Sequence, residues 1–170
     1  VYFKLQTFIY MPANGIVQGM RPIIGYNYGA GESSRVKSTI RYSLLTAAGL
    51  MLTGTILALA LPKQILALFD ADAALMSAGV TALRIISLGF LVSSVGLIYS
   101  GVFEAIGNGR NSLIISLLRQ FVITIPLSFI LTRFFGPTGV WISFPVGELC
   151  ASAAAFCLLK KYQNGAFSPL

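Results

Sequence analysis

Four ionisable side chains fall inside long apolar runs of this sequence: Arg21, Glu104, Arg119 and Glu148. A charged side chain among apolar groups is costly unless it is paired or faces water, so such charges usually contact a partner, an ion or a substrate. Two arginines balance two carboxylates, which allows pairing between helices. The chemistry open to these residues is therefore ion pairing, proton exchange and electrostatic recognition of a charged ligand.

Arg119 and Glu148 are expected to be neighbours in space. Their apolar runs are consecutive and are joined by the short link FGPTG. At the rise of an α-helix, Glu148 lies roughly 15 Å and Arg119 roughly 21 Å from the outer end of its own predicted helix. Two interpretations remain open: a structural pair that fixes helix register, or a Glu148 carboxyl that carries a proton or binds substrate. Glu104, just before Gly107, is expected near the mouth of its run.

The composition shows which elements must hold these charges. Hydrophobic residues make up 56% of the chain and charged residues 10%, whereas about 25% of a soluble domain is charged. So few charges cannot cover the surface of a soluble domain. We therefore predict an all-α integral membrane protein, a polytopic bundle of helices.

The apolar runs predict the boundaries of these helices, because a span needs roughly 20 apolar residues. We predict about five transmembrane helices over residues 5–29, 42–62, 83–107, 112–134 and 138–160. Between the second and third, apolar residues from Ile65 to Phe69 precede Asp70 and Asp72. This pattern predicts an amphipathic helix over residues 64–78 at the outer interface.

The basic residues predict the orientation of the bundle. Five spans place the loops near 35 and 110 and the C-terminal end on one side, and positions near 70 and 137 on the other. The first side holds Arg35, Lys37, Arg41, Arg110, Lys160 and Lys161, and the second holds Lys4, Lys63, Arg84 and Arg133. The richer side is predicted to be cytoplasmic, in a cell (inner or plasma) membrane. We assign the net charge of +7 to topology and lipid contact, and expect no nucleic-acid partner.

Prolines and glycines within the spans are expected to bend helices or bring them close together. The prolines are Pro12, Pro22, Pro126 and Pro145, and the glycines are Gly25, Gly29, Gly49, Gly54, Gly96 and Gly101. In the first span, Gln18, Arg21 and Asn27 offer polar contacts to a cavity. Such broken helices suit a protein that moves, although glycine and proline are common in membrane helices of any kind.

The sequence lacks the residues of common catalytic sites. It contains no His and no GxxxxGK[ST] loop, and its stretch GNGRNS lies between membrane segments rather than after a strand. Cys150 and Cys157 lie in one predicted helix, about 10 Å apart along its axis, which is beyond disulfide reach. We therefore expect no enzyme.

Three stretches resemble the multidrug and toxic compound extrusion (MATE) family, in the same order and spacing. They are QGMRPIIGYNYGAGESSRVKSTIR, GVFEAIGNGRNSLIISLLRQ and FFGPTGVWISFPVGE. The resemblance implies a twelve-helix transporter of two lobes, of which this chain is similar to helices eight to twelve. A carboxylate at Glu104 departs from the family, where an amide is more usual, so no family role is carried over to it.

The resemblance also implies what such a protein does. It implies Na⁺- or H⁺-coupled antiport that exports amphipathic or cationic drugs by alternating access, with no cofactor besides the coupling ion. The expected partners are membrane lipids, these substrates and the amino-terminal lobe of the same chain. A flippase for lipid-linked precursors or polysaccharides is the alternative, because Arg21 and Arg119 suit a phosphate group. The segment alone is expected to be inactive.

Overall fold

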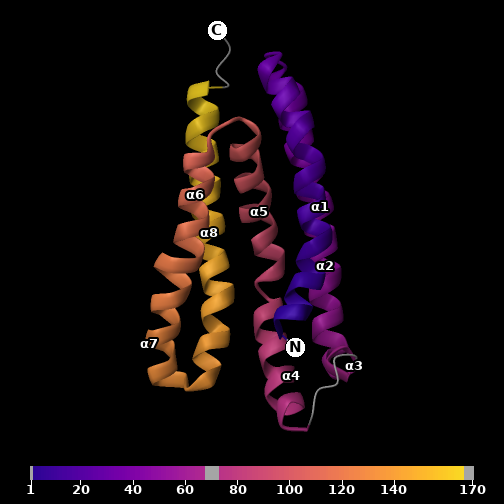
Figure 1. Ribbon diagram of the computed structural model, residues 1–170, viewed down its shortest axis with the longest axis vertical. Helices are drawn as coiled ribbons and strands as arrows, with labels where there is room; N and C mark the ends of the chain where they lie inside the picture. Colours follow the sequence, from indigo (N-terminus) through magenta and orange to yellow (C-terminus); the bar gives the residue numbers. More distant parts are fainter. Residues whose placement is uncertain (1, 68–72, 167–170) are drawn as a thin grey trace.

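A computed structural model describes residues 2–67 and 73–166, and those residues are almost entirely helical (Figure 1). The elements are α1 (Tyr2–Gly29), α2 (Ser33–Ala60), α3 (Pro62–Ala67), α4 (Ala73–Ser87), α5 (Phe90–Ala105), α6 (Gly109–Leu117), the π-helix η1 (Leu118–Thr124), α7 (Ile125–Phe135) and α8 (Pro137–Ala166). Long helices run side by side along one axis, so tight turns at both ends determine the topology.

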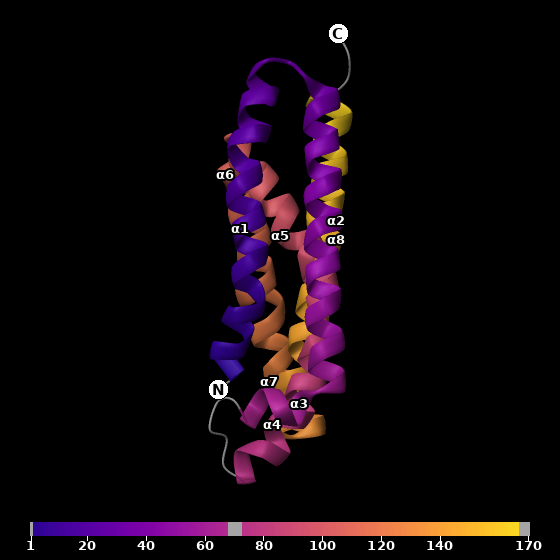
Figure 2. The same ribbon diagram turned by 90° about the vertical axis from the view of Figure 1, so that its right-hand side faces the viewer.

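The two ends of the bundle hold the loops in the predicted groups. The α1–α2 turn, the α5–α6 turn and the end of α8 lie at one end, and the α7–α8 turn lies at the other (Figures 1 and 2). Gly31, Gly107 and Gly136 make these turns at φ of 76°, 77° and 58°. Residues with a Cβ rarely adopt such angles, so glycine ends each helix where the chain reverses.

Three helical segments are long and apolar enough to cross a membrane by length and composition: Ser33–Ala60, Gly109–Phe135 and Pro137–Tyr162. Met76–Ser87 and Phe90–Ala105 make a fourth if this pair, bent by 53°, is one span. The remaining predicted span, 5–29, corresponds to α1, which has 28 residues but is not among these segments. We attribute this to its polar residues, including Gln18, Arg21 and Asn27.

Three predicted elements differ from the structure. The span predicted over 83–107 covers the end of α4 and all of α5, with a break between Ser87 and Phe90. Helix α2 begins at Ser33 rather than at 42, because Arg35, Lys37 and Arg41 extend the helix beyond its apolar run. The expected interfacial helix over 64–78 corresponds to two elements, since α3 ends at Ala67 and α4 begins at Ala73. Leu68, Phe69, Asp70 and Asp72 lie outside the described residues.

Helix α5 lies at the centre of the bundle and packs against α1, α2 and α8. The main core cluster includes Ile24, Val36, Val102 and Phe103, all of them fully buried. Large apolar side chains on the outer faces, such as Phe129, are exposed. This outward-facing apolar surface suits contact with lipid, where it is not exposed to water.

Neighbouring helices approach closely at some of the glycines that were predicted to permit it. A Cβ at Gly25 would lie 3.2 Å from the Ala105 carbonyl oxygen, and one at Gly96 would lie 3.3 Å from Ser152 Oγ. At Gly101 it would lie 2.6 Å from Val17. Gly29 and Gly49 meet no other part of the described chain within 4 Å in this position, so the prediction of close packing at these two glycines stays a prediction. Gly29 instead is the last residue of α1.

The break between α4 and α5 packs against a proline of α8. A Cβ at Gly89 would lie 3.0 Å from Pro145 Cα, so only glycine fits there without displacement. Thr55 Oγ1 of α2 donates a hydrogen bond of 3.0 Å to the Ser87 carbonyl at the end of α4. The neighbouring helices thus support the bend. Pro145 lies inside α8, which continues through it, as α1 continues through Pro12 and Pro22.

Candidate functional site

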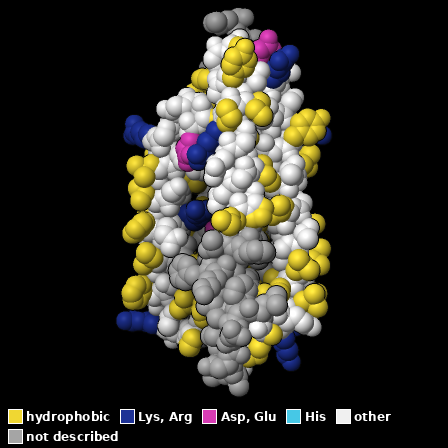
Figure 3. Space-filling view, turned by 45° about the vertical axis from the view of Figure 1, so that its right-hand side comes forward, with side chains coloured by type: hydrophobic (Ala, Val, Ile, Leu, Met, Phe, Trp, Pro, Cys, Tyr) yellow, Lys and Arg dark blue, Asp and Glu magenta, His cyan; other side chains and the backbone are white. Residues whose placement is uncertain are grey.

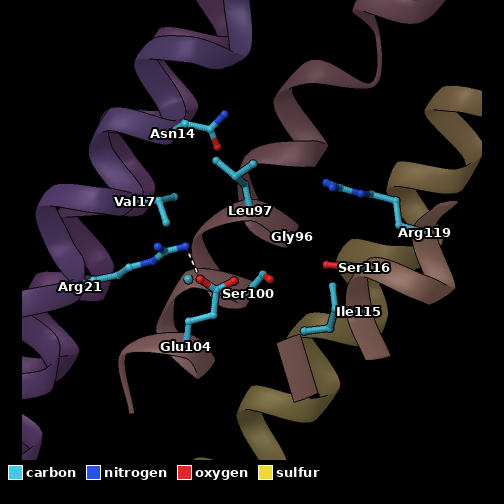
Figure 4. Close-up of a pocket in the computed structure, with 11 residues that line it drawn as sticks. Asn14, Val17, Arg21, Gly96, Leu97, Ser100, Glu104, Ile115, Ser116 and Arg119 are labelled. Atoms are coloured by element: carbon cyan, nitrogen blue, oxygen red, sulfur yellow. Dashed lines mark ion pairs between the residues drawn. The ribbon is translucent and has the colours of Figure 1, made fainter. Parts of the chain in front are cut away.

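A polar cavity of about 170 Å³ lies between α1, α5, α6 and the start of η1. Its lining consists of Asn14, Val17, Arg21, Gly96, Leu97, Ser100, Gly101, Glu104, Ile115, Ser116 and Arg119. In Figure 4, Arg21 and Glu104 lie on one side of it and Arg119 extends toward it from the other. In Figure 3, an acidic and a basic side chain lie together on the upper half of one face, and hydrophobic side chains line both edges of that face.

Arg21 and Glu104 form an ion pair between α1 and α5 (Figure 4). The Ser112 hydroxyl of α6 donates a hydrogen bond of 2.8 Å to Glu104 Oε1, and Ser100 Oγ lies 2.7 Å from Ser112 Oγ. This network joins three helices. The side chains of the ion pair are 43% and 37% exposed, so both charges are accessible in this chain.

Arg119 and Glu148 form the second pair, and their predicted proximity is present in the structure. Arg119 Nη1 lies 3.8 Å from Glu148 Oε2, with side-chain exposures of 31% and 14%. This Oε2 atom is buried and accepts no hydrogen bond in the described part of the chain, and the Tyr10 side chain supplies a hydrogen bond to the same carboxyl group. The carboxylate therefore depends mainly on Arg119 for charge compensation.

A local change in helix geometry accompanies Arg119. The residues from Leu118 to Thr124 form a π-helix between α6 and α7. Pro126 follows it and has no N–H to donate to the Val122 carbonyl, which removes one α-helical bond at this point. Pro126 thus lies at the beginning of α7, and the expected break at this proline takes the form of a wide turn. Such turns occur frequently at functional sites.

Two predicted residues of α1 lie away from the cavity. Asn27 is buried, and its Nδ2 donates a hydrogen bond of 2.7 Å to the Ile23 carbonyl of its own helix. Gln18 is exposed and is not part of the cavity lining. Gln18 and Asn27, which were expected to contact a cavity, therefore do not line this one. Arg21, Glu104 and Arg119 do line it.

The cavity also contains polar residues that the sequence interpretation missed, namely Asn14, Ser100 and Ser116. A helical-spacing argument could have found Asn14, because it lies on the same face of α1 as Val17 and Arg21. The two serines carry no comparable signal. Among the described residues, no three His, Cys, Asp or Glu side chains gather as a metal site.

A membrane helix bundle with charged side chains around a polar cavity is the arrangement expected of a transporter. Residues 1–130 match the MatE family model, and the chain belongs to this family. It is a multi-pass membrane protein of the class predicted from the three sequence motifs.

Known relatives agree with this family. The multidrug export protein MepA of Staphylococcus saprophyticus is 28% identical over 155 residues, which cover 91% of this chain and 34% of that protein. The chain thus spans about a third of the length of the curated relatives that it matches.

Solved transporter structures share the fold. A ligand complex of the MATE multidrug transporter DinF-BH has a TM-score of 0.86 at 33% identity, covering 97% of this chain and 37% of that one. A transporter of the MOP superfamily from Pyrococcus furiosus, described with a binding pocket of reverse polarity, has a TM-score of 0.92 at 20% identity. The match covers 99% of this chain and 38% of the Pyrococcus furiosus chain. At 20% identity, this likeness shows the fold alone.

Proposed function

We propose that the complete protein exports amphipathic or cationic drugs in exchange for Na⁺ or H⁺, by alternating access. The observation that carries this proposal is the polar cavity with an accessible ion pair inside a MatE-family bundle. Relatives described as multidrug export proteins and multidrug transporters support this class of substrate. The family's second lobe completes the pathway, so residues 1–170 are proposed to be inactive alone.

The residues of the cavity suggest how charge recognition occurs. Glu104 is partly exposed and already shares its carboxylate between Arg21 and Ser112. A cationic drug can replace Arg21 at this carboxylate, since the released Arg21 side chain is 43% exposed and can be hydrated. Such a replacement costs little because an exposed ion pair contributes at most about 1 kcal/mol. Glu148 is the second proposed carboxylate, alternating between its Arg119 partner and the coupling ion.

A flippase for lipid-linked precursors is the second candidate function. Two arginines, Arg21 and Arg119, and one carboxylate, Glu104, line the cavity. This excess of positive charge would favour a phosphate group, which arginine binds through paired hydrogen bonds. The reverse-polarity pocket described for the Pyrococcus furiosus transporter shows that pocket charge varies among proteins of this fold.

An efflux measurement distinguishes the two functions. We expect the complete transporter to expel a cationic fluorescent dye from a drug-sensitive bacterial strain and to lose this activity when the Na⁺ and H⁺ gradients are collapsed. Residues 1–170 expressed alone serve as the matched control and are expected to give no efflux. Dye retention by cells that contain folded complete transporter would contradict the proposal, as would full efflux by residues 1–170.

The proposed topology places the ends near Arg35 and Arg110 in the cytoplasm. Cysteines introduced at Arg35 and Arg110 should resist an impermeant thiol reagent added outside intact cells, whereas cysteines at Lys63 and Pro137 should react. The background for this test is Cys150→Ala with Cys157→Ala, since both native thiols are free and exposed. Strong labelling at Arg35→Cys with none at Lys63→Cys would reverse the assignment.

A further inference from the structure

The π-helical turn is closed by a side chain as well as by the backbone. The Thr124 hydroxyl donates a hydrogen bond of 2.6 Å to the carbonyl of Arg119, five residues earlier. The backbone N–H of Ile125 also bonds to a carbonyl five residues earlier, that of Gln120. Thr124 is buried, so this hydroxyl has no competing water and the bond is retained.

Helix α8 packs against the same turn at a glycine. A Cβ built on Gly147 would collide with Thr124 Oγ1 and would lie 3.7 Å from the Arg119 carbonyl oxygen. Thr124 could avoid that collision only by rotating, which would remove its hydroxyl from Arg119. Glycine at 147, next to Glu148, therefore preserves the bond that closes the turn.

The wide turn also controls which way Arg119 faces. Each residue of an α-helix turns the chain by about 100°. Converting the π turn to an α-helical turn would therefore rotate α6 and Arg119 about the helix axis relative to α7. Helix α7 is held by α8, while Arg119 must face both the cavity and Glu148. The observed geometry meets both requirements because the turn is wide.

We infer that Thr124 and Gly147 are positioning residues, which hold the π turn so that the Arg119 guanidinium faces the cavity and stays beside Glu148. This inference rests on the proposed function, because it assigns these two residues to the charge site of the same transport pathway. Neither residue is part of the cavity lining, so their effect is exerted through Arg119.

Thiol accessibility tests this inference without requiring transport. In the complete transporter with Cys150→Ala and Cys157→Ala, Arg119→Cys reports the direction of position 119, and Asn14→Cys on α1 is the control in the same cavity. Adding Thr124→Val should slow labelling of Arg119→Cys by a water-soluble methanethiosulfonate by about fivefold, the shift expected from losing one hydrogen bond. Labelling of Asn14→Cys should be unchanged.

Two further variants make the test specific. Thr124→Ser keeps the hydroxyl and should restore the original labelling rate, whereas Gly147→Ala should act like Thr124→Val. An unchanged rate at Arg119→Cys with Thr124→Val would overturn the inference, as would failure of the serine to rescue it. Equal slowing at Asn14→Cys would also overturn it, because this result shows general collapse of the cavity. Absence of drug efflux would leave these rates unaffected and would count against the proposed function only.

Discussion

Gly139→Ala is expected to destabilise the complete transporter strongly and to lower its melting temperature. An alanine Cβ at this position would collide with the backbone carbonyl group of Leu131 and would lie 2.6 Å from the backbone nitrogen of Thr132. Backbone atoms cannot rotate away as a side chain can, so the turn between α7 and α8 would have to open. Overpacking costs about 1–3 kcal/mol when side chains can adjust, and we expect at least the upper value here.

Gly49→Ala is the matched control, because it makes the same substitution within a transmembrane helix. In the described ranges of the chain, no atom of another side chain or helix lies within 4 Å of a Cβ at Gly49. Alanine is favoured over glycine in a helix by roughly 0.5–1 kcal/mol, so this variant should melt at or slightly above the original temperature. Fluorescence size-exclusion chromatography after graded heating would compare the two, and a Gly139→Ala protein that melts like Gly49→Ala would refute the steric argument.

Arg119→Gln should destabilise the protein much more than Glu148→Gln. The Arg119 side chain is 31% exposed and reaches the cavity, while that of Glu148 is 14% exposed and has one carboxylate oxygen without a hydrogen bond. Removing the arginine therefore leaves a buried charge, whereas removing the carboxylate leaves a cation near water. We expect Arg119→Gln to lower the free energy of unfolding by about 2–3 kcal/mol. This value lies at or below the lower end of the range for breaking a buried ion pair.

The double variant identifies the cause of this loss. Arg119→Gln combined with Glu148→Gln should recover part of the stability, because no buried charge remains. Arg21→Gln is the control for removing an arginine at an accessible pair, and its cost should be below about 1 kcal/mol. Thermal melts of the purified complete transporter measure all four variants. A double variant no more stable than Arg119→Gln would contradict the pairing argument.

Glu148→Gln also separates the two interpretations of this pair. If the carboxyl carries the coupling ion or binds substrate, this variant should accumulate normally in the membrane and lose efflux, and Arg119→Gln should not restore it. If the pair is structural, loss of efflux should follow loss of folded protein. Normal efflux and stability in both single variants would reject both interpretations.

Much of the membrane architecture follows from the sequence alone. Apolar runs in a chain with 10% charged residues can be stable only in lipid, and the alternation of runs and loops groups the ends of the helices. The link FGPTG is short, so Arg119 and Glu148 had to lie on antiparallel neighbours. The lengths of the apolar runs and loops are sufficient for these conclusions, because a short loop can join a helix only to a neighbouring antiparallel helix.

Only the tertiary structure decided the partners of the remaining charges. Arg21 is distant in sequence from both carboxylates, and the packing of α1 against α5 selects Glu104. Asn27 looked equally suited to a cavity, but its amide binds the carbonyl of its own helix. Long-range packing determines these outcomes, and no local pattern records it.

Glycine and helix geometry show the same division. The sequence by itself determined where the chain can turn or bend, as at the link FGPTG and at Pro126. It could not distinguish Gly49, which faces open space, from Gly139, which touches backbone. The π turn at Arg119 likewise depends on Thr124 and on Gly147 of another helix. Steric fit between helices is a property of their relative positions, so it exists only once the bundle has assembled.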